Sequence, residues 1–398
     1  MMRISNRCAS ITESATLAID AKAKALVAQG QDVIGFGVGE PDFDTPLFIR
    51  DAAKAALDKG ITRYTPAQGT LDLRRAICEK LQAQNGLTYD PTQIVVSNGA
   101  KHSLSNIFQA LLNPGDEVII PSPCWVSYPE MVTISEGVPV LVSAGEDKGF
   151  KAQASDVEPF ITQKTRAIVL NSPNNPNGFV YTREELEGFA ALCKQHDIVI
   201  ISDEVYEHFI YDGQEHISIA SLSEDAYQRT VVVNGFSKTF AMTGWRIGYT
   251  ASCKQLASAM GNLQSHSASN PNSIAQYACI AALNGGDASV QQMVGEFAKR
   301  RQLIVDKIRA ISGLSCLSPD GAFYVMMNVQ GIVGKKYNGQ KISGSMDFAS
   351  YLLEDQGVAV VPGLPFGSDI HCRLSYATSY DAIERGLTRV GQFVSKLT

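Results

Sequence analysis

The chain has 398 residues, of which 45% are hydrophobic and 19% are charged, and it carries a formal net charge of -6. This composition is typical of a folded protein with a large buried core, and it excludes a disordered chain. An acidic surface has no general attraction for nucleic acid, so we expect no nucleic-acid partner.

Export and membrane signals are absent from the sequence. The first residues contain no apolar run of signal-peptide length, and no run of about 18 apolar residues occurs elsewhere. The eight cysteines are scattered without a C-x-x-C pair, which favours reduced thiols over disulfides or a zinc site. We therefore expect a cytoplasmic protein with no membrane partner and no bound metal.

In chain order, short apolar runs alternate with helical patterns. Each run is nearly continuous in apolar residues, as expected for strands buried on both faces of a parallel sheet. The runs cover residues 94–96, 118–120, 167–170, 198–201 and 231–233. Alternation of strands and helices predicts an α/β fold, with a mostly parallel sheet covered by helices on both sides.

Two helices are predicted between these runs. Apolar residues recur at helical spacing over 104–111 and again over 186–193. Thr182 and Glu185 have the spacing of a capping box, which predicts that the second helix begins there.

The pattern changes after Gly285-Gly286, which we interpret as a turn. A long helical pattern follows, and within it we interpret the charged run 299–301 as a solvated face. Strand-like pieces at 322–327 and 358–361 and a final helix over 380–396 complete the chain.

These patterns predict two domains. The large domain spans residues 48–289. A smaller α+β domain combines residues 1–47 with residues 290–398.

Polar residues follow four of the apolar runs. Ligands bind beyond the carboxyl ends of strands in open α/β sheets, so these residues are candidates for a site. Singly, each has an ordinary explanation as a turn glycine, a helix cap or a surface lysine. The candidates are a glycine turn at 97–101, several amides within 171–178, Asp203, and Ser237 and Lys238 with Arg246 nearby.

Together, these groups match the needs of pyridoxal phosphate. A lysine amine is needed for the aldehyde, and a carboxylate for the ring nitrogen. A glycine turn at the N-terminus of a helix suits the phosphate.

Motifs along nearly the whole chain resemble those of class I aminotransferases of fold type I, most closely the bacterial and plastid-type aspartate aminotransferases. They lie at residues 39–46, 97–101, 125–128, 171–178, 202–206, 234–249 and 373–378. The resemblance implies a large α/β domain with a mostly parallel sheet, a smaller α+β domain, and pyridoxal phosphate as the cofactor.

The resemblance also implies the roles of the cofactor site. Lys238 bonds to the cofactor aldehyde and later moves the proton, and Asp203 pairs with the ring nitrogen. Tyr206 and Asn175 bind the ring oxygen, and Trp125 stacks on the ring. The phosphate is bound by Gly99, Ala100, Lys101, Ser237 and Arg246, together with Tyr64 of a neighbouring subunit.

For the substrate, the resemblance implies that Arg373 holds the α-carboxylate as a bidentate fork. The other substrate residues that it implies are Gly39, Trp125, Asn175 and Lys101. Lys101, with Ser14 nearby, would bind the distal carboxylate of an acidic substrate. The alternative role for Lys101 is to neutralise the phosphate.

The implied reaction is ping-pong transamination between L-aspartate and 2-oxoglutarate in a homodimer with shared active sites. Transamination of prephenate or aromatic amino acids, or a β-elimination on the same fold, stays open as an alternative. A dinucleotide site at 35–39 is rejected, because position 40 is Glu and the following Pro-Asp-Phe-Asp-Thr-Pro cannot open a helix. A transcription regulator is disfavoured, because the catalytic pattern starts within about forty residues and the chain is acidic.

Overall fold

The structure is a computed structural model that describes residues 3–9, 11 and 15–398. Its helices are α1 (Asn6–Ala9), α2 (Ala15–Ala28), α3 (Leu47–Asp58), α4 (Leu71–Asn85), α5 (Ala100–Leu111), α6 (Ser127–Ile134), α7 (Ala154–Val157), α8 (Arg183–His196), α9 (Glu224–Arg229), α10 (Lys254–Ser267), α11 (Ser273–Gly285), α12 (Asp287–Arg309), α13 (Ser345–Gln356) and α14 (Tyr380–Ser395). Its strands are β1 (Ile34–Gly35), β2 (Ile94–Ser97), β3 (Glu117–Ser122), β4 (Val138–Ser143), β5 (Thr165–Asn171), β6 (Val199–Asp203), β7 (Thr230–Gly235), β8 (Gly248–Ala251), β9 (Tyr324–Asn328), β10 (Lys336–Tyr337), β11 (Gln340–Lys341), β12 (Val358–Ala359), β13 (Val361–Pro362) and β14 (His371–Ser375). Among these helices, none has both the length and the apolar character needed to cross a membrane.

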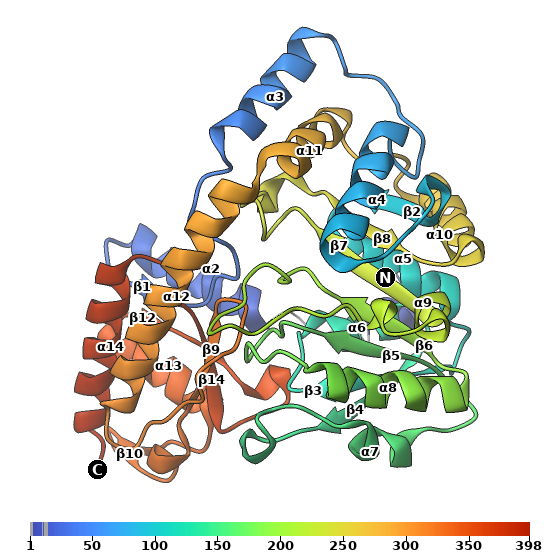
Figure 1. Cartoon of the computed structure of the whole chain (residues 1–398). Coiled ribbons are helices and arrows are strands. Elements are labelled where there is room, and N and C mark those ends of the chain that lie inside the picture. The colour runs from blue at the N-terminus through green and yellow to red at the C-terminus, as the bar shows by residue number, and fades with distance from the viewer. Residues whose placement is uncertain (1–2, 10, 12–14) are drawn as a thin grey trace.

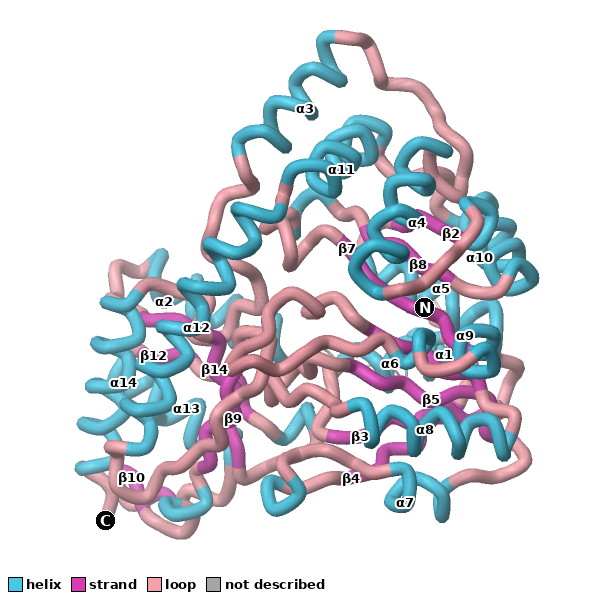
Figure 2. The backbone as a smooth tube through the Cα atoms, in the orientation of Figure 1, coloured by secondary structure: helices cyan, strands magenta, loops and turns pink. Residues whose placement is uncertain are grey.

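A central sheet of seven strands has the order β2-β8-β7-β6-β5-β3-β4 (Figure 2). All five predicted apolar runs are strands of this sheet, and β8 runs opposite to the other six strands. The predicted mostly parallel α/β fold is therefore confirmed.

The sequence patterns missed β4 and β8. β4 lies at an edge and buries only Val142, and β8 is a four-residue strand that begins with a glycine.

The strands are apolar throughout because successive side chains pack on opposite faces of the sheet. In β5, Ile168 belongs to a core cluster with Leu186 and Phe189 of α8. The next residue, Val169, belongs to a second cluster with Leu104 and Phe108 of α5. Helices on both faces thus explain why the run shows no alternation.

Helix α8 begins with the predicted capping box. The Glu185 amide donates to Thr182 Oγ1 at 3.3 Å, and the Thr182 amide donates to Glu185 Oε2 at 2.7 Å. Two amides without partners inside the helix are satisfied, so the helix starts at this point.

A smaller group of elements lies beside the large sheet. The antiparallel sheet β13-β14-β9 and the pair β1-β12 pack with α13, α14 and the later turns of α12 (Figure 1). Val290 of α12 packs in the core around β2 and β8, whereas Phe297 and Ile304 pack in the core of the smaller group. The division of the chain at 47/48 and 289/290 stays a prediction.

The interpretation of residues 299–301 as a solvated face is wrong for two of the three residues. Lys299 is exposed, but Arg300 and Arg301 are buried over aromatic rings. Arg300 Nη1 lies 2.6 Å from Asp42 Oδ1, and Arg301 Nη2 lies 2.7 Å from Asp212 Oδ2. A charge run predicts exposure only when the fold brings no carboxylates to meet it, and here the loops carrying Asp42 and Asp212 cover α12.

Candidate active site

A cavity of about 370 Å³ lies at the carboxyl ends of the parallel strands, where the large sheet meets β9 and β14. Its size is within the range of roughly 300–1,000 Å³ that is usual for small-molecule sites. All but two of the site residues predicted from the sequence line it. They are Gly39, Ala100, Lys101, Trp125, Asn175, Asp203, Tyr206, Ser237, Lys238, Arg246 and Arg373.

Gly99 and Tyr64 are the two predicted residues outside this lining. Gly99 precedes α5 with a φ of 85°, and a Cβ there would lie 2.4 Å from Nη2 of Arg246. A glycine is therefore needed for the Arg246 guanidinium to lie against the start of the helix. Tyr64 is 92% exposed on this chain. Ser14 lies outside the described residues.

Lys238 follows β7 and points toward the N-terminal segment. Its Nζ donates a 2.5 Å hydrogen bond to the carbonyl oxygen of Gly39. Burial lowers the pKa of Lys238 to about 8, and the charges of Arg246 and Arg373 act in the same direction, although Glu40 opposes them. A lowered pKa increases the fraction of neutral amine, which is the nucleophilic form of lysine.

Asp203 ends β6, where its backbone is paired in register with Asn171 of β5. Its Oδ2 accepts a 2.5 Å hydrogen bond from the hydroxyl of Tyr128, and its Oδ1 accepts one of 3.3 Å from the Val205 amide. Burial raises the pKa of Asp203 to about 6, although both hydrogen bonds lower it. A carboxylate buried in this way is stabilised by a cationic partner in the cavity.

Arg373, on β14, reaches the cavity from the smaller group of elements. Its Nη1 donates to Asn175 Oδ1 at 3.1 Å, and its Nη2 donates to the Gly37 carbonyl at 2.6 Å. The buried Nε has no hydrogen-bond partner, and the guanidinium carbon lies 4.6 Å from the ring centre of Tyr324. A desolvated, planar and incompletely satisfied guanidinium is a strong site for a carboxylate.

The start of α5 forms an anion site with the cations around it. The first amides of a helix have no partners inside the helix, and here they open toward the cavity at Ala100 and Lys101. Arg246 is held by a 2.8 Å hydrogen bond from its Nη1 to the Thr243 carbonyl. The Nζ of Lys101 lies 4.9 Å from the ring centre of Trp125.

Two tyrosines of the cavity were given no role by sequence reasoning. Tyr128 lies three residues after Trp125, within the motif at residues 125–128, so its place in that motif is the signal that could have found it. Tyr324 begins β9, and its hydroxyl lies 2.8 Å from that of Tyr206, 118 residues away. No local pattern marks it. The other lining residues without a predicted role are Leu104, Val126, Ser127, Asn171, Val205, Gly235 and Thr243.

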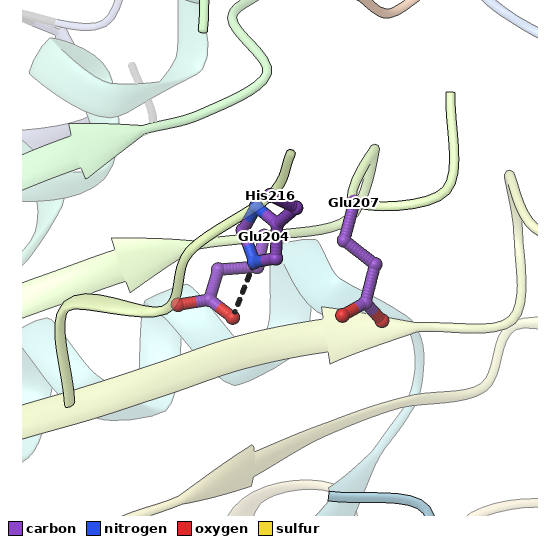
Figure 3. Close-up of side chains that lie close together, drawn as sticks. All are labelled: Glu204, Glu207 and His216. Atoms are coloured by element: carbon purple, nitrogen blue, oxygen red, sulfur yellow. Dashed lines mark hydrogen bonds and ion pairs between the residues drawn. The ribbon is translucent and has the colours of Figure 1, made fainter. Parts of the chain in front are cut away.

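Glu204, Glu207 and His216 lie close together, outside the cavity lining, with one possible ligand atom of each within 4.8 Å of the others (Figure 3). Glu204 accepts hydrogen bonds of 2.7 Å from Ser202 and Ser218 and lies 3.1 Å from His216 Nε2. Glu207 is paired with a buried lysine and accepts from two asparagine amides; these partners are Lys80, Asn85 and Asn234. Both carboxylates already have protein donors, which a metal ion would have to displace.

The fold and the cavity define a class of protein. A mostly parallel α/β sheet presents a lysine, a buried carboxylate and an anion site at its strand ends, as in fold-type I enzymes that use pyridoxal phosphate. The donor set fits this cofactor: an amine for its aldehyde, a buried carboxylate for its ring nitrogen, and free amides with cations for its phosphate.

Comparison with known proteins identifies the family. Residues 31–390 match the model for aminotransferase class I and II. The chain is 47% identical to an aspartate aminotransferase of Bacillus subtilis, over 99% of this chain and 100% of that one. It is 46% identical to an aspartate/prephenate aminotransferase of Cereibacter sphaeroides, over 100% of both chains.

Solved structures agree with this result. The aspartate aminotransferase of Rhizobium meliloti superposes with a TM-score of 0.97 at 42% identity and full coverage of both chains. That of Thermus thermophilus, solved with maleate, has a TM-score of 0.93 at 43% identity and covers 99% of this chain and 100% of its own. The chain belongs to the class I and II aminotransferase family. It is an aminotransferase, and its cofactor is pyridoxal phosphate.

Proposed function

We propose that this aminotransferase transfers the amino group of L-aspartate to 2-oxoglutarate in two half-reactions at one cavity. The observation that carries the proposal is the convergence of Lys238, Asp203 and Arg373 on that cavity from separate elements. They supply an amine of lowered pKa, a buried carboxylate and a carboxylate-binding guanidinium.

The cofactor is held by the anion site and the sheet. Residues 99–101 at the start of α5, the Ser237 hydroxyl and the Arg246 guanidinium bind its phosphate, with the free amides of Ala100 and Lys101 facing it. Asp203 keeps the ring nitrogen protonated, since a buried carboxylate stabilises a cation beside it. Tyr206 and Asn175 bind the ring oxygen, and Trp125 covers the ring face. When bound, pyridoxal phosphate supplies an aldehyde for the amine and a ring that accepts electrons from the substrate.

Lys238 is the residue that moves the proton during transamination. Its amine lies in the wall of the cavity, beside the Gly39 carbonyl. Because the pKa is lowered to about 8, the amine takes up and releases a proton near neutral pH.

The substrate is bound through its two carboxylates. Arg373 and the Gly39 amide hold the α-carboxylate. Lys101 reaches the side-chain carboxylate of aspartate or glutamate through its flexible stem. Maleate, with which the Thermus thermophilus relative was solved, is likewise a compound with two carboxylates.

A second substrate class is supported by the relatives named aspartate/prephenate aminotransferase. Prephenate carries a carboxylate on its ring in addition to that of its keto-acid group. Lys101 would bind the ring carboxylate of prephenate in the same way as it binds the side-chain carboxylate of aspartate.

We further propose a homodimer in the cytoplasm in which Tyr64 binds the phosphate of the neighbouring subunit. The 92% exposure of Tyr64 leaves its hydroxyl available to another chain. We also propose that the monomer is divided into two domains, residues 48–289 and residues 1–47 with 290–398.

The test combines cofactor mapping with a donor panel. Borohydride reduction of the purified holoenzyme and peptide mapping should place the cofactor on Lys238, and an adduct on another lysine would refute the assignment. Aspartate, glutamate and phenylalanine are tested as amino donors with a keto-acid acceptor, and prephenate, itself a keto acid, is tested as the acceptor with glutamate as the donor. The acidic substrates should rank first. With an amino acid that carries a leaving group on its β carbon, such as cysteine, release of that group with ammonia and pyruvate in place of a new amino acid would support β-elimination.

A further inference from the structure

Tyr324 joins the proposed cofactor residue Tyr206 to the proposed substrate residue Arg373. Its hydroxyl oxygen lies 2.8 Å from that of Tyr206, and its ring centre lies 4.6 Å from the guanidinium carbon of Arg373. It lines the cavity and is 1% exposed. A Cβ on Gly39 would lie 2.7 Å from the same hydroxyl, so the N-terminal segment also closes over it.

We propose that Tyr324 is a positioning residue that donates its hydrogen bond to Tyr206 and thereby strengthens the hold of Tyr206 on the cofactor ring oxygen. The inference rests on the proposed role of Tyr206. A phenol has one proton, so a Tyr206 that donates to the cofactor can only accept from Tyr324. Among the hydrogen bonds of the described residues, Tyr206 is the one partner of the Tyr324 hydroxyl.

The direction of the effect follows from the polarisation of hydrogen-bond chains. Accepting a bond from Tyr324 makes Tyr206 a stronger donor. A stronger donor stabilises the negative charge on the ring oxygen, and this favours loss of the proton from the nitrogen that joins the cofactor to Lys238. The charged groups facing the two phenols are Arg373 on β14, Asp203 on β6, Lys238 after β7, whose Nζ lies 5.9 Å from the ring centre of Tyr206, and Glu40 of the N-terminal segment.

The readout is the pH midpoint at which bound pyridoxal phosphate changes its absorbance in the holoenzyme. A hydrogen bond to a charged group moves such a midpoint by about one to two pH units, and cooperativity supplies roughly 10–30% of a bond. Tyr324→Phe should therefore raise the midpoint by roughly 0.2–0.5 units, and Tyr206→Phe should raise it by more. The aspartate KM should stay within about twofold in Tyr324→Phe, because the ring beneath Arg373 remains.

One further variant separates the role of the Tyr324 ring from that of its hydroxyl, and a second variant is the control. Tyr324→Leu should raise the KM for aspartate by roughly two- to tenfold, since the cation–π contact with Arg373 is lost. Tyr376→Phe is the control: its hydroxyl is also buried in the smaller group and donates to the Ala322 carbonyl at 3.2 Å, outside the cavity lining. Its midpoint and KM should match those of the unmodified enzyme.

A double-mutant cycle decides the outcome. If Tyr324 acts through Tyr206, adding Tyr324→Phe to Tyr206→Phe should produce no further shift. Additive shifts, or an unchanged midpoint in Tyr324→Phe while Tyr206→Phe shifts it, would overturn the inference and leave the proposed function intact. Failure of the proposed function is visible separately, as an unmodified enzyme with no cofactor on Lys238 or no transamination.

Discussion

The hydroxyl of Tyr128 donates a 2.5 Å hydrogen bond to Oδ2 of Asp203, and both groups are buried in the wall of the cavity. Tyr128 comes from α6, and Asp203 ends β6. This bond is one of two that lower the pKa of Asp203 against the effect of its burial. Tyr128 therefore helps to keep Asp203 ionised, which its proposed pairing with the ring nitrogen requires.

Tyr128→Phe should weaken cofactor binding. Loss of the bond raises the pKa of Asp203 above its value of about 6, so less of the carboxylate is ionised near neutral pH. We expect the Kd of pyridoxal phosphate for the cofactor-free enzyme to rise roughly tenfold, as for one hydrogen bond to a charged group. Fluorescence titration measures it. Tyr181→Phe removes another buried hydroxyl, bonded to Ala152 and outside the cavity lining, and serves as the control. Equal affinities in both variants would contradict the role of Tyr128.

Attachment of the cofactor to Lys238 should depend on pH with a midpoint near 8. Burial lowers the pKa of Lys238 to about 8, and only the neutral amine attacks an aldehyde. The rate should rise about tenfold per pH unit below pH 8 and level off above it, because the neutral fraction is then complete. Stopped-flow absorbance after mixing pyridoxal phosphate with the cofactor-free enzyme measures this rate. Free lysine is the reference, and its rate should keep rising to about pH 10. A protein profile identical to that of free lysine would show that burial does not tune the amine.

Lys101→Ala should separate acidic from apolar substrates. Its ammonium lies 4.9 Å from the ring centre of Trp125 in the cavity wall, where it can meet a distal carboxylate. We expect kcat/KM for aspartate to fall by about tenfold or more, while that for phenylalanine is nearly unchanged. Both donors are assayed at saturating pyridoxal phosphate. Parallel losses for the two donors, with weaker cofactor retention, would instead assign Lys101 to the phosphate alone.

Asp42→Asn should destabilise the protein, because Asp42 is the partner of the buried Arg300. Breaking a fully buried pair costs about 3–5 kcal/mol. The Asp42 side chain is 31% exposed, so we expect a loss of roughly 1–2 kcal/mol in the free energy of unfolding. Urea denaturation of the holoenzyme measures it. Lys299→Gln is the control, since Lys299 is 67% exposed beside Glu296, and it should change stability by less than about 0.5 kcal/mol. Equal losses in the two variants would contradict the buried role of Arg300.

The sequence by itself determined five of the seven strands of the central sheet and the polar residues that follow them. Five runs apolar on both faces predict strands, and all five are strands of the large sheet. Asp203 is the last residue of β6, and Lys238 lies three residues after the end of β7; parallel strands bring their carboxyl ends to one edge. Local pattern and this rule of topology are enough to place both side chains in one cavity.

Only the tertiary structure decided which residues from distant parts of the chain contact the cavity that contains Lys238 and Asp203. Arg373 reaches Asn175 across 198 positions, and Tyr324 reaches Tyr206 across 118. Arg300 lies in a charge run that suggests solvent, yet it is buried against Asp42 across 258 positions. These contacts depend on how β9, β14 and α12 pack against the large sheet. No hydrophobic period or turn signal encodes that packing, because it is set by side-chain complementarity between segments far apart in the chain.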